Sequence, residues 1–436
     1  MRRPFEVRRR QVLDAISPGV MVIYSAPVTY RNNDVENDYR QDSDFYYLAG
    51  FAEPESVLIL KSGPDSKTIL LLRERDPGRE TWDGPRLGVN AAVSVVHVDE
   101  AYPISALSEK LTENLKGCER LYFTLGQNST ADEQIISTLR RLRTTVRRGG
   151  SWPTTLIDPG TILHEMRLCK DESEISDLRR AIEITGRAHR AVFETTHAGH
   201  WEYELEAVLR SEFCRRGTER VAYAPIVASG VNATVLHHRS NNRQSLPGEL
   251  ILVDAGCEFG YQSADITRTF PASGRFNPLQ RAAYEIVLGA QEKAIEAVKP
   301  GATLDEIHDI AVRELVIGLQ ALGVIDDDVK SAVDRGIYKK YYMHRTSHWL
   351  GMDVHDVGAY QVSGVPRPLV PSMVLTVEPG LYFPLGDEAV PEGLRGTGIR
   401  IEDDILVTSE GFNNLSQDIP KTPDEIESIM SQVLGR

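Results

Sequence analysis

Four acidic residues lie in or directly after stretches of the sequence that are otherwise apolar: Asp254, Asp265, Glu378 and Glu402. A buried carboxylate without a partner is costly or takes up a proton, and four of them together repel one another. Arginine or lysine partners are one remedy, and bound cations are another. Two divalent cations carry four positive charges, which would balance the four carboxylates. The charge balance therefore favours a site for two metal ions.

A histidine can complete such a ligand set without adding charge, and His348 is the candidate. Carboxylate oxygens with one imidazole nitrogen suit Mn²⁺, and they can also hold Co²⁺ or Zn²⁺. Two such ions about 3.5–4 Å apart can share and acidify a water molecule and stabilise the oxyanion of an attacked amide. Cleavage of an amide bond is therefore the chemistry that this set of residues favours.

Asp254 and Asp265 form a local half of this predicted site. The residues between them include Gly256 and Gly260, so a hairpin with a glycine-containing turn would bring the two side chains together. No HExxH motif is present, so the other ligands must come from distant parts of the chain.

Each of these residues also has an ordinary structural explanation. An aspartate at the end of a strand is usually a cap or a turn residue. Glu402 begins an acidic run that could be a solvated edge, and Glu378 precedes a Pro-Gly turn. His344 and His348 are four residues apart and could simply share one face of a helix. The metal site is therefore a hypothesis about the whole set of residues.

The elements that position these residues fall into two predicted domains. Residues 1–165 contain short apolar runs and one helical pattern, which indicate an α/β domain with a largely parallel sheet. The predicted strands are 20–26, 56–60 and 68–72, and the predicted helix is 104–115. Gly, Pro, Ser and Thr gather at 146–160, so we place the domain boundary there or just beyond.

Residues 166–436 form the second predicted domain, which is α+β. Capping residues predict helices that begin after Asp171, Asn277 and Thr303, the last of which can end at Gly323. Apolar runs between the helices predict strands at 249–256, 264–270, 373–379 and 398–407. These strands carry the four carboxylates.

Composition narrows the class of protein. The chain has 436 residues, of which 41% are hydrophobic and 26% charged, as in soluble globular proteins. A net charge of −14 argues against a nucleic-acid or anionic-membrane partner. No transmembrane run or signal-peptide pattern is expected. The four cysteines include no CxxC pair, which excludes a thiolate zinc site and favours a cytoplasmic location.

Four segments resemble the creatinase-like, or pita-bread, family of metallopeptidases. They are VDAGCEFGYQSADITRTFP (253–271), MHRTSHWLGMDVHDVG (343–358), LTVEPGLYFP (375–384) and GTGIRIEDDILV (396–407). They follow the order and spacing of the family and are most similar to its proline-specific branch, which holds aminopeptidase P and prolidase. The resemblance implies an α/β N-terminal domain, an α+β pita-bread catalytic domain, and a homodimer or homotetramer.

The resemblance assigns a role to each predicted ligand. Asp254 would bind one metal ion, and Asp265 and Glu402 would bridge both. His348 and Glu378 would complete the shell of the second ion. A hydroxide held by the two metals would be the nucleophile, and Glu378 would pass its proton toward the leaving proline nitrogen. The X–Pro amide is tertiary, so that nitrogen carries no hydrogen and must be protonated before it leaves.

Further matched positions concern catalysis and the substrate. His237 occupies the family's outer histidine position, and His355 stands where the family stabilises the attacked carbonyl. His344 would line the proline side of the cleft. Tyr382 follows the Glu378 motif at the family's spacing, and Arg400 is expected to pair with a carboxylate near the metals. Any of these five could instead only pack behind the site.

The N-terminal half is more similar to aminopeptidase P than to prolidase, in YRQDSDFYYLAGFAEPESVLIL (39–60) and ETWDGPRLG (80–88). In that family the N-terminal domain mediates association and reaches toward a neighbouring subunit's active site, which makes Trp82 a candidate substrate-binding residue. The alternative is an ordinary core or loop tryptophan. Arg345 departs from the family pattern, in which a small residue, often Gly, is usual. A long cation beside His344 could change how the cleft receives substrate.

The sequence therefore predicts a metal-dependent aminopeptidase that releases the N-terminal residue from peptides with proline in the second position. Its expected cofactors are two divalent ions, with Mn²⁺ preferred. A prolidase restricted to Xaa-Pro dipeptides is the alternative, because the catalytic motifs barely separate the two activities. A metal-free peptide-binding module of the same fold is less favoured, since all five ligand positions carry ligating residues.

Overall fold

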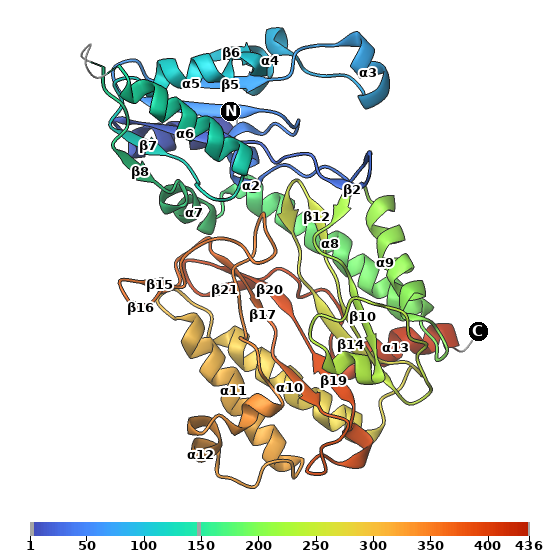
Figure 1. Cartoon of the computed structure of the whole chain (residues 1–436). Coiled ribbons are helices and arrows are strands. Elements are labelled where there is room, and N and C mark those ends of the chain that lie inside the picture. Colours follow the sequence, from blue (N-terminus) through green and yellow to red (C-terminus); the bar gives the residue numbers. More distant parts are fainter. Residues whose placement is uncertain (1–3, 146–149, 435–436) are drawn as a thin grey trace. The chain divides into compact units, whose positions relative to one another are not determined.

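The computed structural model describes residues 4–145 and 150–434. The chain forms two compact units, Met1–Met166 and Arg167–Arg436, shown in blue to green and in green to red in Figure 1. Residues 146–149 of the predicted boundary region lie outside the described residues. Among the described helices, none has both the length and the apolar character that a membrane span requires.

A six-stranded mixed sheet forms the centre of the first unit. Its order is β6 (Glu100–Pro103), β5 (Lys67–Leu72), β4 (Val57–Ser62), β1 (Gly19–Tyr24), β7 (Arg120–Tyr122) and β8 (Thr155–Ile157). The prediction of a largely parallel sheet is wrong at the centre, because β4 runs antiparallel to both β1 and β5. Only a short turn joins β4 to β5, and parallel neighbours would need a long crossover.

Helices cover this sheet and bury its alternating apolar residues. They are α1 (Pro4–Ala15), α2 (Ser43–Ala49), α4 (Val89–Val96), α5 (Leu107–Leu115) and α6 (Ser129–Arg143), whereas α3 (Pro77–Asp83) buries none of its residues. Val20 and Val22 of β1 and Ile69 and Leu71 of β5 lie in one core cluster with residues of α5 and α6. Because these strand residues alternate, they share one face of the sheet. A small hairpin, β2 (Tyr30–Asn32) and β3 (Val35–Glu36), lies outside the sheet.

The helix predictions for the second unit are confirmed. Its long helices are α8 (Glu172–Thr195), α9 (Glu202–Arg215), α10 (Pro278–Glu296) and α11 (Leu304–Ala321). Asp171, Asn277 and Thr303 cap α8, α10 and α11, each within a complete capping box. The helix α7 (Gly160–Leu168) precedes them, and α12 (Val329–Asp334) and α13 (Pro423–Leu434) follow. Helix α8 packs along α9, and α10 packs along α11 (Figure 1).

The strands of the second unit form several small antiparallel sheets. One contains β10 (Ile226–Ser229), β11 (Leu250–Asp254) and β14 (Thr267–Pro271), and another contains β17 (Val374–Val377), β20 (Asp403–Val407) and β21 (Phe412–Asn414). Strand β18 (Gly380–Phe383) pairs with β19 (Thr397–Arg400). Two further sheets contain β9 (Arg220–Val221), β12 (Cys257–Phe259), β13 (Gln262–Ser263), β15 (Gln361–Val362) and β16 (Val365–Pro366).

The run predicted as one strand at 398–407 is broken. Strand β19 ends at Arg400 and pairs with β18, whereas β20 begins at Asp403 and pairs with β17. Glu402 therefore lies where the chain changes from one sheet to another, and Glu378 lies at the corresponding change between β17 and β18. Asp265 lies between β13 and β14. These three carboxylates thus stand at strand junctions and not within strands, which frees their side chains to face one another.

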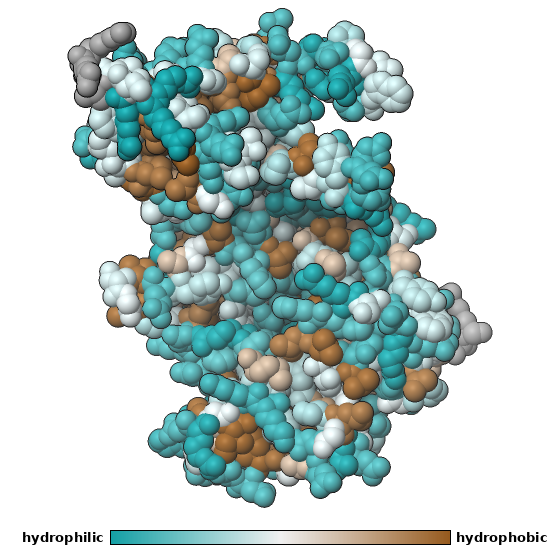
Figure 2. Space-filling view, in the orientation of Figure 1, coloured by the Kyte–Doolittle hydropathy of each residue, from teal (hydrophilic) through white to brown (hydrophobic). Residues whose placement is uncertain are grey.

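Apolar side chains of the second unit are withdrawn into a large core. Leu178 and Ile182 of α8 lie in one cluster with Val253 of β11 and Phe270 of β14. Figure 2 shows a face on which hydrophilic residues predominate and apolar ones gather only in small groups. Packing of this kind fixes the strands whose ends carry the predicted ligands.

Candidate metal centre and active-site cavity

The first two predicted ligands are joined by a hairpin. Asp254 is the last residue of β11, where it pairs with Thr267 of β14. Between Asp254 and Asp265 the chain turns through β12 and β13, and Gly260 adopts φ +56° at the turn. That backbone conformation disfavours side chains, which accounts for the glycine. The glycine-containing hairpin predicted for this segment is therefore present.

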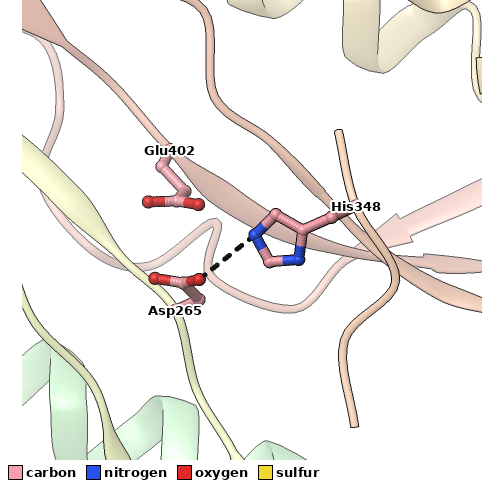
Figure 3. A group of neighbouring side chains, drawn as sticks. All are labelled: Asp265, His348 and Glu402. Carbon is pink, nitrogen blue, oxygen red and sulfur yellow. Dashed lines mark ion pairs between the residues drawn. The ribbon is translucent and has the colours of Figure 1, made fainter. Parts of the chain in front are cut away.

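Distant segments bring further ligating side chains to the same point. Asp265, His348 and Glu402 offer ligand atoms that all lie within 4.8 Å of one another, and Figure 3 shows the three side chains converging. The Nε2 atom of His348 lies 3.4 Å from Oδ2 of Asp265 and 3.5 Å from Oε1 of Glu378. All three residues of the group are buried, so their charges interact in a medium of low dielectric constant.

The orientation of His348 suits a metal ligand. Its backbone N–H donates to Oγ1 of Thr376, and its Nδ1 lies 3.0 Å from the carbonyl oxygen of Trp349. A hydrogen on Nδ1 would satisfy that carbonyl and leave the Nε2 lone pair facing the carboxylates. Burial lowers the pKa of His348, but hydrogen bonding to Asp265 and the charge of Glu378 outweigh it and raise the pKa to about 9. The Nε2 atom therefore lies where two carboxylates stabilise a positive charge.

Burial and crowding also raise the pKa values of the predicted carboxylate ligands. Burial, followed by the charges of Asp265 and Glu378, raises the pKa of Glu402 well above its usual value. Burial raises the pKa of Glu378 to about 8, against the opposing effect of His348. The pKa of Asp254 is raised as well, mainly by burial. The carboxylates are crowded, so their ionised forms are costly unless a positive charge lies between them. Carboxylate oxygens with one imidazole nitrogen fit divalent cations such as Mn²⁺, Co²⁺ or Zn²⁺.

A chain of hydrogen bonds runs from Asp254 to His344. The Nη2 atom of Arg400 donates to Oδ2 of Asp254 at 2.6 Å, and its Nη1 donates to the hydroxyl of Tyr382 at 2.9 Å. That hydroxyl lies 2.8 Å from Nε2 of His344. Arg400 and Tyr382 are buried, so this chain holds His344 in a fixed orientation relative to the carboxylates.

The site opens into a cavity of about 670 Å³. Its walls include the five predicted ligands, three further predicted histidines and two arginines: Asp254, Asp265, His348, Glu378, Glu402, His237, His344, His355, Arg345 and Arg400. A volume of this size suits a small ligand such as a short peptide. The cavity therefore gives a substrate access to the candidate metal ligands.

Comparison with known proteins identifies the family. The model of Metallopeptidase family M24 matches residues 176–409, and that of the Aminopeptidase P N-terminal domain matches residues 5–122. The chain belongs to metallopeptidase family M24. The fold predicted from the sequence, an α/β N-terminal domain and an α+β pita-bread domain, is confirmed by these matches.

Individual M24 peptidases match over nearly the whole chain. The chain is 42% identical to Xaa-Pro aminopeptidase of Escherichia coli over 432 residues, or 98% of each chain. It matches the solved structure of aminopeptidase PepP of Pseudomonas aeruginosa with a TM-score of 0.97, at 42% identity and over 100% of both chains. A structure of a variant of Escherichia coli aminopeptidase P in complex with substrate matches with a TM-score of 0.97, at 41% identity and over 99% of both chains.

Two predicted substrate residues of this M24 peptidase need separate comment, because Tyr382 does not line the cavity and Trp82 belongs to the other compact unit. Tyr382 is buried, and its hydroxyl is hydrogen-bonded to His344 and Arg400. Trp82 belongs to α3 of the first unit, where 86% of its surface is exposed. That exposure excludes a core tryptophan, and a role for Trp82 in substrate binding stays a prediction.

Tyr223 is a site residue that sequence reasoning missed. Its hydroxyl lies 2.5 Å from Oδ1 of Asp254 and 2.5 Å from Oδ1 of Asp265. Burial, followed by the charges of these two carboxylates, raises the pKa of Tyr223 well above its usual value, so the hydroxyl keeps its hydrogen. In the segment VAYAPIVAS (221–229) nothing distinguishes this side chain from a core tyrosine.

We expect Tyr223→Phe to weaken metal binding while the fold is kept. The phenyl ring retains the packing, but the hydrogen bond that orients the two aspartates is lost. Loss of such an orienting bond typically lowers metal affinity by about 10- to 100-fold. Titration of metal-stripped protein with Mn²⁺ by calorimetry measures this change directly. Tyr203→Phe, on an exposed side chain in α9, is the matched control, and equal affinities in both variants would contradict the role.

Proposed function

We propose that this M24 peptidase removes the N-terminal residue from peptides that carry proline in the second position. The observation that carries the proposal is the convergence of five buried or partly buried ligating side chains on the wall of one cavity. Identity of 42% with Xaa-Pro aminopeptidase of Escherichia coli, over 98% of both chains, supports the choice of substrate.

The five side chains would hold two divalent ions, with Mn²⁺ preferred. Asp254, Asp265, His348, Glu378 and Glu402 would together hold them. The ions, when bound, supply an acidified water and positive charge that faces the carbonyl oxygen of the attacked amide. Arg400 holds Asp254 through its bond to Oδ2, and Thr267 donates to Oε2 of Glu402 at 2.6 Å, so the ligand oxygens are oriented beforehand.

Glu378 is the group that we assign to proton transfer. Its side chain lines the cavity and lies 3.5 Å from His348 and 3.6 Å from His344. A proton accepted at its carboxylate would pass to the proline nitrogen of the substrate, which has no hydrogen of its own. Protonation makes that nitrogen a leaving group, so the C–N bond can break.

Histidines on the cavity wall would bind and orient the peptide. The ring of His355 lies 4.3 Å from that of His348 between centroids, and burial lowers its pKa, so it is a neutral hydrogen-bond donor. We assign it to the carbonyl oxygen of the attacked bond, where negative charge develops. His344, held by Tyr382, would pack on the proline ring, and His237 would contact the peptide at the outer side.

Further properties of the protein are part of the same proposal. We assign residues 1–165 to an N-terminal domain and 166–436 to the catalytic domain, close to the division between the two compact units. The proposal also includes a homodimer or homotetramer, in which Trp82 of one copy contributes to substrate binding in another copy. It further includes a cytoplasmic location. The absence of a CxxC pair among the cysteines supports that location.

Hydrolysis of the tripeptide Ala-Pro-Ala by metal-stripped protein, with and without added Mn²⁺, tests the function. We expect release of the first alanine only when metal is added. Cleavage of the dipeptide Ala-Pro but not of the tripeptide would favour a prolidase. An inactive protein that retains no metal would favour the peptide-binding module, although all five ligand positions carry ligating residues.

A further inference from the structure

An ion pair on the cavity wall stands apart from the candidate metal centre. Arg345 bonds through Nη2 to Oδ1 of Asp305, in the first turn of α11, and both residues line the cavity. Their side chains are 57% and 50% exposed, so the pair lies at the solvent side of the cavity. A pair this exposed contributes little to stability, so it is open to reorganisation by a ligand.

Arg345 can bind a ligand more readily than Arg400, the other arginine of the cavity wall. Arg400 is buried and bonded to Asp254, Tyr382 and Thr267. Among the described residues, the guanidinium of Arg345 bonds to Asp305 alone. A guanidinium has five N–H donors in a planar fork, so Arg345 can bind a second carboxylate beside that of Asp305.

The two ends of the cavity wall carry different groups. Asp254, Asp265, Glu378 and Glu402 gather at its inner end, and a guanidinium with unused donors stands at its outer end. A short peptide whose first amide bond lies at the proposed metal centre carries its negative C-terminal carboxylate at the far end. Such a peptide fits with its amino end inside and its carboxylate outside.

We propose that Arg345 makes this enzyme prefer substrates with a carboxylate on the residue directly after proline. The carboxylate is either the C-terminus of a tripeptide or an acidic side chain at that position. Asp305 competes for the same guanidinium, so it limits the strength of the preference. The inference rests on the proposed function and names a substrate class for it.

Three substrates test the inference on the full-length, Mn²⁺-loaded protein: Ala-Pro-Ala, its C-terminal amide, and Ala-Pro-Glu amide. We expect kcat/KM to be about three- to ten-fold higher for Ala-Pro-Ala than for its amide, mainly through KM. The Glu peptide separates the two sources of the carboxylate. If it is preferred as well, a side chain suffices, and if it is not, the C-terminus is required.

Variants of the ion pair make the test specific. In Arg345→Met, the ratio of kcat/KM for Ala-Pro-Ala to kcat/KM for its amide should fall close to one. In Asp305→Asn, the same ratio should increase. Arg335→Met is the matched control, because Arg335 forms an exposed ion pair with Asp327 that does not line the cavity. Equal cleavage of acid and amide by the parent protein, or an unchanged preference in Arg345→Met, overturns the inference and leaves the proposed function intact. Failure to cleave any of the three peptides overturns the proposed function and the inference with it.

Discussion

Asp265→Asn should abolish both metal retention and peptide hydrolysis. Asp265 lies 3.4 Å from His348, shares the hydroxyl of Tyr223 with Asp254, and is one of the five proposed metal ligands. Asparagine keeps the shape of the side chain but removes the charge. Because bound ions contribute several kcal/mol of transition-state stabilisation, kcat/KM should fall by about 10³-fold or more. Metal content by mass spectrometry and hydrolysis of Ala-Pro-Ala give the two readouts.

The same substitution should affect stability mainly when metal is present. In the metal-stripped protein it relieves repulsion between buried carboxylates but also removes the ion-pair partner of His348, so Tm should change little. With Mn²⁺ present the parent should be the more stable, because the ions bind only its folded state tightly. Asp424→Asn, on an exposed carboxylate of α13, should change neither quantity much. Full activity in Asp265→Asn would contradict the assigned ligand set.

His355→Ala should lower turnover while the metals stay bound. The segment around His355 is anchored independently of the imidazole, since Asp356 accepts bonds of 2.6 Å from Arg167 and from Lys170. Asp353 accepts another bond of 2.6 Å from Arg167. Removal of the ring should therefore leave the chain in place and delete only the donor to the developing oxyanion.

The expected loss is about 10²- to 10³-fold in kcat, as for other single oxyanion donors, with little change in KM. Steady-state kinetics with Ala-Pro-Ala, beside metal analysis of the same sample, measures both quantities. His197→Ala is a suitable control, because His197 is exposed and does not line the cavity. Loss of metal from His355→Ala would show that the residue supports the ligands and does not act on the substrate.

Local sequence signals predicted the elements well where they are strong. The capping boxes at Asp171, Asn277 and Thr303 mark helix starts that depend only on neighbouring residues. The carboxylates could be selected because a charge within an apolar stretch is unusual and demands a partner. Motif resemblance then linked segments more than a hundred residues apart, such as those of Asp254 and Glu402.

Features that depend on contacts between distant segments could not be predicted from the sequence. The chain between Arg400 and Asp403 changes sheets, yet the sequence GIRIEDDILV (398–407) has the pattern of one continuous strand. Tyr223 becomes a site residue only through its contacts with two aspartates that follow it by 31 and 42 positions. A pattern of hydrophobicity records burial, but it does not record which buried groups meet.

The candidate ligands come from strand junctions that are far apart in the sequence and meet only in the folded protein. The lifetime of the protein should therefore depend on the supply of metal. An unfolded chain holds no such cluster, so all of the free energy of metal binding favours the folded state. At a hundredfold excess of ion over its dissociation constant this linkage amounts to about 2.7 kcal/mol, or a hundredfold fewer unfolded molecules. Proteases act mainly on those unfolded molecules. In a cell starved of the ion, the peptidase would be degraded faster and would not persist as an inactive pool.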